Sequence, residues 1–513
     1  MHATITSGAL LGVEACRIEV EIDLGPGMMI FSTVGLPASA VCEARTRVKS
    51  ALVNCGYGFP QRRVTVNLAP AHIRKEGTGF DLPMALGILA ADGKLPLEVL
   101  ADSLVIGELA LDGRVRAVRG VLPLAAWARK TGLKRIVVPR ANAAEGAVVE
   151  GIEVLGVEHL TECIEVLLGR ADPVVTPHFE DPPIDEVLDL KDVRGQAMAR
   201  RALEVAAAGG HNLLLIGPPG AGKTMLSRRM STLTPPMSFE ERLETSIVAS
   251  VAGLLPPDRP LVGVRPFRAP HHSVSSPALT GGGPSARPGE VSLAHNGVLF
   301  LDELPEFRRD ALESLRQPLE DGEVVVARAQ ATFTYPSRFM LVAAMNPCPC
   351  GYLGHPRRAC ECNPHQVQAY RARISGPLLD RIDLQVPVDP VDARALRTTS
   401  TEESSAVVRA RVLAARHIQE VRLVDTPIRC NAHLRPAELR RFCALDAAAD
   451  TYLTRAMDKL ELSARAHDRI LKVARTIADL AGREALAVAD VAEAVQYRQL
   501  DRSLTTRAAA SVA

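Results

Sequence analysis

The spacing of hydrophobic residues changes twice along the chain and predicts three kinds of structure. In the first third, alternating runs such as Arg17–Leu24 predict strands, and stretches with helical spacing such as Ala38–Asn54 predict helices. In the middle, apolar strand-like runs alternate with helical stretches, which predicts a mostly parallel sheet covered by helices. In the last third, apolar residues recur at helical spacing, most clearly over Leu462–Leu480, and predict a helical bundle.

Two segments mark the boundaries between these parts. Asp172–Asp185 is rich in proline and acidic residues, as interdomain linkers are. The second boundary follows the strand-like run Ile382–Val386, beyond which strand signals almost vanish. We therefore expect an α+β domain at 1–170, a linker at 171–185, an α/β core at 186–390 and an all-helical lid at 391–513.

The composition limits the classes of function. The 513 residues suit about three domains, and a hydrophobic content of 47% is enough for several cores. The 60 basic and 59 acidic residues nearly cancel, so the net charge neither indicates nor excludes binding to nucleic acid. Aromatic residues make up only 4%, which argues against recognition of DNA by stacked bases and favours contacts to its backbone.

The N-terminal segment and the lengths of the apolar runs indicate where the protein works. Met1–Gly12 lacks the basic start and the long apolar run of a signal peptide. No stretch of the sequence approaches the roughly 20 consecutive apolar residues that cross a bilayer. We therefore expect a cytoplasmic protein that makes no contact with a membrane.

A glycine-rich loop between a strand and a helix predicts a nucleotide site. The apolar run Asn212–Ile216 leads into this loop, and an amphipathic helix begins where it ends. In such a Walker A pattern, backbone N–H groups surround the phosphates, a lysine faces the β- and γ-phosphates and a hydroxyl binds magnesium. The predicted contacts to ATP and Mg²⁺ are Gly217, Pro218, Pro219, Gly220, Ala221, Gly222, Lys223 and Thr224.

Two further strand ends supply polar residues to the same site. Val298–Leu301 ends in Asp302 and Glu303, the Walker B arrangement, in which Asp302 holds the magnesium shell and Glu303 polarises the attacking water. The next strand leads to Asn346, which we assign to the same water or to the γ-phosphate. An asparagine at a strand end is otherwise a cap or turn residue.

Longer motifs around these residues carry a family resemblance. They are GGGP at 281–284, RPGEVSLAH at 287–295, GVLFLDELPEF at 297–307, NPCPCG at 346–351 and SGPLLDRID at 375–383. With them the chain closely resembles the YifB/ComM family of magnesium-chelatase-like AAA+ proteins over essentially its whole length. The resemblance implies an ATPase that works as a homo-hexamer.

The resemblance also implies roles for arginines outside the Walker motifs. In AAA+ rings the position of Arg381, just before the last core strand, faces the neighbouring subunit's ATP and acts as an arginine finger. Taken by itself, an arginine before the last strand is also a candidate for a surface ion pair. Arg465, near the start of a lid helix, is the candidate for a second sensor of the γ-phosphate, and Arg469 one turn later competes for this role.

The same AAA+ branch contains the MCM helicases, and this implies two insertions that line a pore and touch DNA. We expect them at Val264–Gly283, within helix 2 of the core, and at Asp321–Tyr335, in a hairpin before the strand that carries Asn346. Arg328 lies where the MCM hairpin has a basic residue, so it is either a contact to DNA phosphates or a solvent-exposed charge. The implied activity is ATP-driven branch migration of DNA in natural transformation, with recombination proteins as partners.

The N-terminal part is similar to the proteolytic domain of Lon-like proteases, through GTGFDLP at 77–83 and IGEL at 106–109. The nucleophilic serine of that motif is replaced by Gly79, and Leu122 stands where the activating lysine belongs. Because a hydroxyl nucleophile needs a base within reach, proteolysis is not expected. A scaffold, or a collar that binds DNA or a partner, is expected instead.

Four of the 10 cysteines form two C-x-C pairs separated by nine residues. Four thiolates this close in sequence suit tetrahedral zinc, and four reduced thiols are the alternative. The nearby His355 and His365 are candidate substitutes for one ligand. The candidate zinc ligands are Cys348, Cys350, Cys360 and Cys362.

Two classes of function follow from these features. A DNA-stimulated motor is favoured over a chelatase-type ATPase that remodels a protein partner, because the Lon-like part and the cysteine pairs are not expected in a chelatase subunit. An ATP-dependent protease is not expected, because Gly79 and Leu122 stand where its nucleophile and its base belong.

Overall fold

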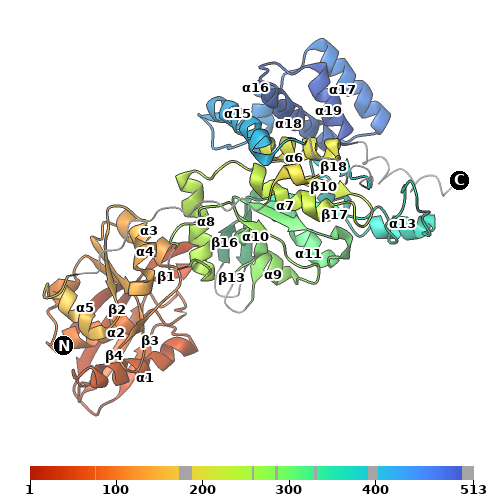
Figure 1. Ribbon diagram of the computed structural model, residues 1–513. Coiled ribbons are helices and arrows are strands. Elements are labelled where there is room, and N and C mark those ends of the chain that lie inside the picture. The colour runs from red at the N-terminus through yellow and green to blue at the C-terminus, as the bar shows by residue number, and fades with distance from the viewer. Residues whose placement is uncertain are drawn as a thin grey trace.

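The computed structural model describes residues 1–75, 77–172, 188–256, 259–283, 287–327, 332–390 and 402–498. Figure 1 shows three groups of elements in chain order, with the N-terminal group at the lower left, a central group around one sheet, and helices alone at the top. Most of the predicted linker and the start of the predicted lid lie outside the described residues, so those boundaries stay predictions.

Among its described residues, the N-terminal group contains two larger sheets and the two-stranded antiparallel pair β6-β7, and it is mixed α and β, as predicted. The first has the order β1-β2-β4-β3, in which only β3 and β4 are parallel, and the second is a parallel sheet of order β5-β8-β9. Every other residue of β2 from Ile18 to Leu24 is buried, which is the alternation that predicted this strand. The elements are β1 (His2–Leu11), β2 (Glu14–Gly25), β3 (Phe31–Val34), α1 (Ser39–Asn54), β4 (Arg63–Ala69), α2 (Asp81–Ala91), β5 (Ser103–Val105), β6 (Glu108–Leu109), β7 (Val115–Arg116), α3 (Val121–Lys130), β8 (Arg135–Pro139), α4 (Ala143–Ala147), β9 (Glu153–Val157) and α5 (Leu160–Leu167).

The central sheet is parallel throughout and has the order β11-β14-β17-β10-β18. Its three middle strands, β10, β14 and β17, are buried along their length, as apolar strands covered by helices on both faces should be. The parallel sheet predicted from the alternation of strands and helices is confirmed. Its strands are β10 (Leu213–Ile216), β11 (Phe267–Arg268), β14 (Val298–Leu301), β17 (Met340–Met345) and β18 (Leu384–Pro387), and the helices around it are α6 (Ala197–Gly209), α7 (Lys223–Leu233), α8 (Phe239–Ala252), α9 (Ser276–Thr280), α10 (Glu290–Leu293), α11 (Arg309–Ser314), α12 (Arg316–Asp321), α13 (Pro364–Arg371) and α14 (Gly376–Leu379).

Two antiparallel hairpins extend from this core. The hairpin of β15 (Glu323–Ala327) and β16 (Thr332–Pro336) lies where it was predicted. The other insertion is shorter than the predicted Val264–Gly283. It is the pair β12 (Gly281–Gly282) and β13 (Arg287–Pro288), between α9 and α10.

The predicted start of that insertion is wrong for a physical reason. Phe267 and Arg268 form the edge strand β11, in parallel register with Val298 and Leu299 of β14, and so belong to the core sheet. A strand of two residues leaves no alternation in the sequence from which it could be recognised.

The C-terminal group contains only helices among its described residues. In α18, Ala466, Ile470, Val473, Ala474 and Ile477 are buried, which fits the spacing that predicted this helix. Lid and core share one hydrophobic cluster, so the lid packs directly on the sheet layer. Its helices are α15 (Ser405–Leu423), α16 (Pro436–Phe442), α17 (Ala447–Leu460), α18 (Ala464–Leu480) and α19 (Val488–Gln496).

The N-terminal group meets the core through α8. Leu243 and Ile247 of α8 pack into the apolar cluster around α3. At the same place the buried Glu145 carboxylate accepts hydrogen bonds from the Ser250 hydroxyl and the Leu122 backbone N–H. Figure 1 shows α8 beside the N-terminal group. Within the described ranges, no helix has the length and apolar character needed to cross a membrane.

Candidate active site

The glycine-rich loop follows β10 at the carboxyl edge of the sheet. Gly217 passes so close to β18 that a Cβ there would lie 2.2 Å from the carbonyl oxygen of Val388. Gly222 has φ +85°, a left-handed conformation that glycine adopts without strain, and α7 begins at the next residue, Lys223. The loop therefore turns sharply and directs the N-terminus of α7 into the site, as phosphate binding requires.

Lys223 is largely buried beneath this loop. Its Nζ donates hydrogen bonds to the carbonyl oxygens of Gly217, at 2.7 Å, and Pro218, at 3.0 Å, and to Oδ1 of Asn346, also at 3.0 Å. Burial lowers the pKa of Lys223, while the negative charges of Asp302 and Glu303 act in the opposite direction. The structure thus brings the lysine of the loop together with the asparagine at the end of β17.

Thr224 and Asp302 form the pair of oxygens predicted to hold magnesium. The Thr224 hydroxyl donates to Oδ2 of Asp302 at 2.7 Å, and Oδ1 of Asp302 accepts from the backbone N–H of Glu303 at 2.9 Å. A hydroxyl beside a carboxylate is the oxygen donor set that Mg²⁺ takes next to a triphosphate. The donor chemistry at this position therefore fits the predicted Mg²⁺.

Glu303 is held in an unusual position. It has φ 53°, in the left-handed region that a glutamate rarely occupies. Its Oε2 lies 3.4 Å from Nδ1 of His272, a residue of the loop that follows β11. His272 was not predicted for the site, because the short strand β11 before its loop was not recognisable from the sequence.

These residues line one cavity of about 500 Å³. A cavity of that size, lined mainly by polar groups and glycine backbone, suits a small polar ligand such as a nucleotide. The lining residues are Pro219, Gly220, Ala221, Gly222, Lys223, Thr224, Met225, Asp302, Glu303, Met345 and Asn346.

Arg381 and Arg465 lie together elsewhere, in a smaller cleft of about 200 Å³ between α12 and α18. The Arg381 guanidinium donates to the carbonyl oxygen of Pro377 at 2.7 Å and pairs with the carboxylate of Glu320. Arg465 is 74% exposed and lies 3.8 Å from Asp380. Neither arginine lines the cavity around Lys223.

Arg469, the competitor of Arg465, is engaged in the structure of the core. It pairs with Asp383, whose buried carboxylate also lies 3.3 Å from Nδ1 of His211. Burial would raise the pKa of Asp383, but the charge of Arg469 and the hydrogen bond with His211 more than offset this and hold it well below its usual range. Arg469 therefore ties the lid to the turn that carries Arg381.

The four clustered cysteines lie in the loop between β17 and α13. Their Sγ atoms all lie within 4.8 Å of one another, an arrangement compatible with a metal site. The nearby His355 accepts hydrogen bonds from the backbone N–H groups of Arg357 and Arg358 through its Nδ1.

Comparison with known proteins connects these features. The family described as magnesium chelatase, subunit ChlI, matches residues 189–396, and its C-terminal part matches residues 402–498. A further family, described as subunit ChlI of Mg-chelatase, matches residues 20–142. The competence protein ComM of Haemophilus influenzae is 45% identical over 511 residues, which cover 98% of each chain. The uncharacterized protein YifB of Escherichia coli is also 45% identical, over 97% of each chain.

The chain belongs to the YifB/ComM family. Its AAA+ core and helical C-terminal region are those of the magnesium-chelatase-like branch. Two partial likenesses concern individual regions of this YifB/ComM chain. Lon protease 2 of Bacillus subtilis is 30% identical over 125 residues, and the probable DNA helicase MCM9 of Arabidopsis thaliana is 25% identical over 217 residues.

The Lon-like part was predicted to lack the nucleophile and base of a protease, at Gly79 and Leu122. Gly79 has no side chain, and Leu122 is fully buried. Of their neighbours, Thr78 donates its hydroxyl to Glu108, and Lys75 is buried with its Nζ on the carbonyl oxygen of Pro70. The Thr78 hydroxyl is therefore bonded to a carboxylate and the Lys75 amine to the backbone. Arg328, the predicted DNA contact, lies outside the described residues.

Proposed function

We propose that this protein is an ATP-driven, hexameric DNA motor of the cytoplasm that promotes branch migration when incoming DNA is recombined during natural transformation. The observation that carries the proposal is the end-to-end likeness to the competence protein ComM. The partial likeness to a probable DNA helicase supports the assignment to DNA. Recombination proteins are the partners that such an activity needs.

The cavity around Lys223 supplies the binding half of the ATPase. With ATP bound, Lys223 would exchange its bonds to the loop carbonyls for the β- and γ-phosphates. Thr224 and Asp302 would hold Mg²⁺, which would supply positive charge to the phosphate oxygens. Glu303 orients and polarises the attacking water. Asn346, bonded to Lys223, positions the same water or the γ-phosphate.

The cleft with Arg381 and Arg465 supplies the other half of the ATPase, because its arginines act on the ATP of a neighbouring subunit. The proposal rests on the positive charge of the two arginines and on their position, because they lie in a cleft separate from the cavity of their own chain. In the free chain Glu320 holds Arg381, and a neighbour's γ-phosphate competes for the same guanidinium. The ring is thus required for hydrolysis, and binding of ATP is a property of each chain.

The two hairpins are the elements proposed to contact DNA. Gly281 of β12 packs against Val326 of β15, where a Cβ on Gly281 would lie 3.5 Å from that side chain. In a ring, adjacent hairpins of this kind from every subunit surround a common axis. Hydrolysis at one interface can then move a hairpin along the phosphate backbone.

A chelatase-type ATPase that remodels a protein partner is the second candidate. It is favoured by the family descriptions, which name the magnesium chelatase subunit ChlI over three segments of the chain. Such an ATPase would respond to a protein and would be indifferent to DNA.

ATP turnover with and without DNA separates the two candidates. Purified protein is assayed alone and with single-stranded, duplex and four-way-junction DNA over a range of salt, with Lys223→Ala as the blank. Stimulation by DNA that weakens steeply with salt is the expected result, because contacts to phosphates release counterions. Turnover that no DNA changes would overturn the motor and favour the protein-remodelling ATPase.

A further inference from the structure

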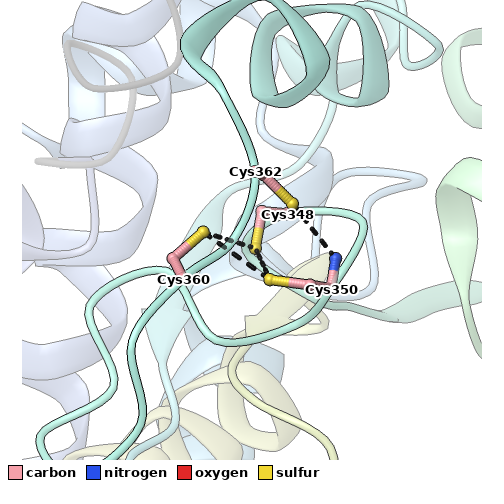
Figure 2. A group of neighbouring side chains, drawn as sticks. All are labelled: Cys348, Cys350, Cys360 and Cys362. Carbon is pink, nitrogen blue, oxygen red and sulfur yellow. Dashed lines mark hydrogen bonds between the residues drawn. The ribbon is translucent and has the colours of Figure 1, made fainter.

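The four clustered cysteines come from two short segments that the chain folds back on each other (Figure 2). Cys348 lies 3.4 Å from Cys350 and 3.6 Å from Cys360, measured between Sγ atoms, and Cys350 lies 3.6 Å from Cys360. Cys362 completes the group, with all four Sγ atoms within 4.8 Å of one another.

These separations agree with a single tetrahedral ion. With Zn–S bonds of about 2.3 Å, the sulfurs of a tetrahedral site lie about 3.8 Å apart. A disulfide would require about 2.05 Å between two of the sulfurs, well below the 3.4 Å of the shortest pair. An iron–sulfur cluster would hold its cysteine sulfurs farther apart, because several metal ions and sulfides lie between them.

The backbone around the cysteines also points to thiolate ligands. The N–H of Cys350 donates to Sγ of Cys362 at 3.4 Å, and the N–H of Leu353 donates to Sγ of Cys348 at 3.3 Å. Such N–H groups orient the sulfurs of a metal site and delocalise their negative charge. We propose that Cys348, Cys350, Cys360 and Cys362 bind one Zn²⁺, and that this ion holds their loop against the nucleotide cavity. Four protein ligands leave no position for water, so the zinc is structural.

The link to the nucleotide cavity is direct. Asn346, which accepts a hydrogen bond from Lys223, lies two residues before Cys348. Gly351, inside the loop, packs so closely on the Walker A loop that a Cβ would lie 2.5 Å from Cδ of Pro219. Beyond the second pair of cysteines, Nε of Arg371 donates to the carbonyl oxygen of Pro347 at 3.3 Å. An ion that closes this loop therefore fixes one wall of the cavity and offsets the entropy of ordering it.

Metal content tests the site without reference to DNA or to turnover. Wild-type protein purified without added metal should contain about one zinc ion per chain, as measured by inductively coupled plasma mass spectrometry. The double variant Cys360→Ser/Cys362→Ser should lose it, and Cys42→Ser, on the distant α1, should keep it. If the double variant does not fold, Co²⁺ exchanged into the wild type is the second measurement, and it should give the visible bands of a tetrahedral tetrathiolate centre. Wild-type protein without zinc, or without those Co²⁺ bands, would overturn the proposal.

The affinity for ATP tests whether the zinc ion braces the nucleotide cavity. Removal of zinc by a chelator should weaken the binding of ATP several-fold, and added Zn²⁺ should restore it, because Pro219 and Asn346 lose their support. Equal ATP affinity with and without the ion would overturn the bracing role and leave the zinc site itself standing. Neither result depends on whether DNA stimulates the ATPase, so this inference and the proposed function fail separately.

Discussion

The nucleotide cavity and the arginine cleft are built in opposite ways. In the cavity, polar side chains from three adjacent strand ends bond to one another, as Lys223 does to Asn346 and Thr224 to Asp302. In the cleft, charged side chains come from the core and the lid, and Arg465 remains mostly exposed. The first is held together by bonds within one chain, and the second presents the mostly exposed Arg465 at its surface.

Under the proposed function, this difference separates the binding of ATP from its hydrolysis. A site whose donors are already oriented can bind ATP without a neighbour, since little reorganisation is required. Under the proposed function, the cations of the other cleft reach a γ-phosphate across a subunit interface. Replacement of single residues in either region tests this division, and the largest effect is expected where ATP binding itself is lost.

Replacement of Lys223 should have the largest effect, because it removes binding itself. Lys223→Ala loses the buried ammonium that faces the β- and γ-phosphates, so ATP affinity should fall by roughly 100-fold or more. Titration with a fluorescent ATP analogue measures this. Lys94→Ala, a partly exposed lysine of the N-terminal part, is the control and should bind normally. Normal affinity in Lys223→Ala would place the nucleotide elsewhere.

Replacement of Arg381 should abolish turnover and spare binding. An arginine finger contributes about 10³-fold or more to the rate of phosphoryl transfer, so Arg381→Ala should lose nearly all ATPase activity. Its affinity for the fluorescent ATP analogue should be unchanged, because Arg381 does not line the cavity. Arg455→Ala, an exposed arginine of α17, should be fully active. A large loss of ATP affinity in Arg381→Ala would contradict the separation.

Replacement of the two lid arginines should have different effects, on stability for Arg469 and on turnover for Arg465. Arg469→Ala removes the charged partner of the buried Asp383, so it should cost about 3–5 kcal/mol and lower the thermal unfolding temperature. Arg465→Ala should leave that temperature unchanged and slow turnover roughly tenfold or more, since a hydrogen bond to a charged group contributes about 1.5–3 kcal/mol. The opposite pattern would make Arg469 the sensor.

His272 should have the smallest effect. Its contact with Glu303 is partly exposed, and such a pair contributes up to about 1 kcal/mol, or roughly fivefold in an equilibrium. His272→Ala should free Glu303 to meet the attacking water and raise the turnover without DNA by a few-fold. Steady-state ATPase assays at saturating ATP measure this, with His417→Ala on the exposed face of α15 as control. Lower turnover would instead indicate that His272 supports Glu303 in catalysis.

The sequence predicted those features that depend on local chain order. The Walker A loop, Asp302 and Asn346 each follow an apolar strand, and parallel strands bring their carboxyl ends to one edge, so their meeting was foreseeable. His272 was missed because it reaches Glu303 from a loop of irregular structure, where no periodicity fixes the direction of a side chain. The Arg469–Asp383 pair joins residues 86 positions apart and depends on how the lid packs on the core. Local patterns in the sequence do not reveal that packing.

One measurement tests the division of the site between subunits most directly. Glu303→Gln and Arg381→Ala proteins, each inactive alone, are mixed in varying ratios and assayed for ATP turnover. With random assembly, about a quarter of the interfaces in an equal mixture join an intact Glu303 to an intact Arg381, so activity should reappear and peak near that ratio. Mixtures that are no more active than the separate variants would contradict the account, because Arg381 would then not act on a neighbour's ATP.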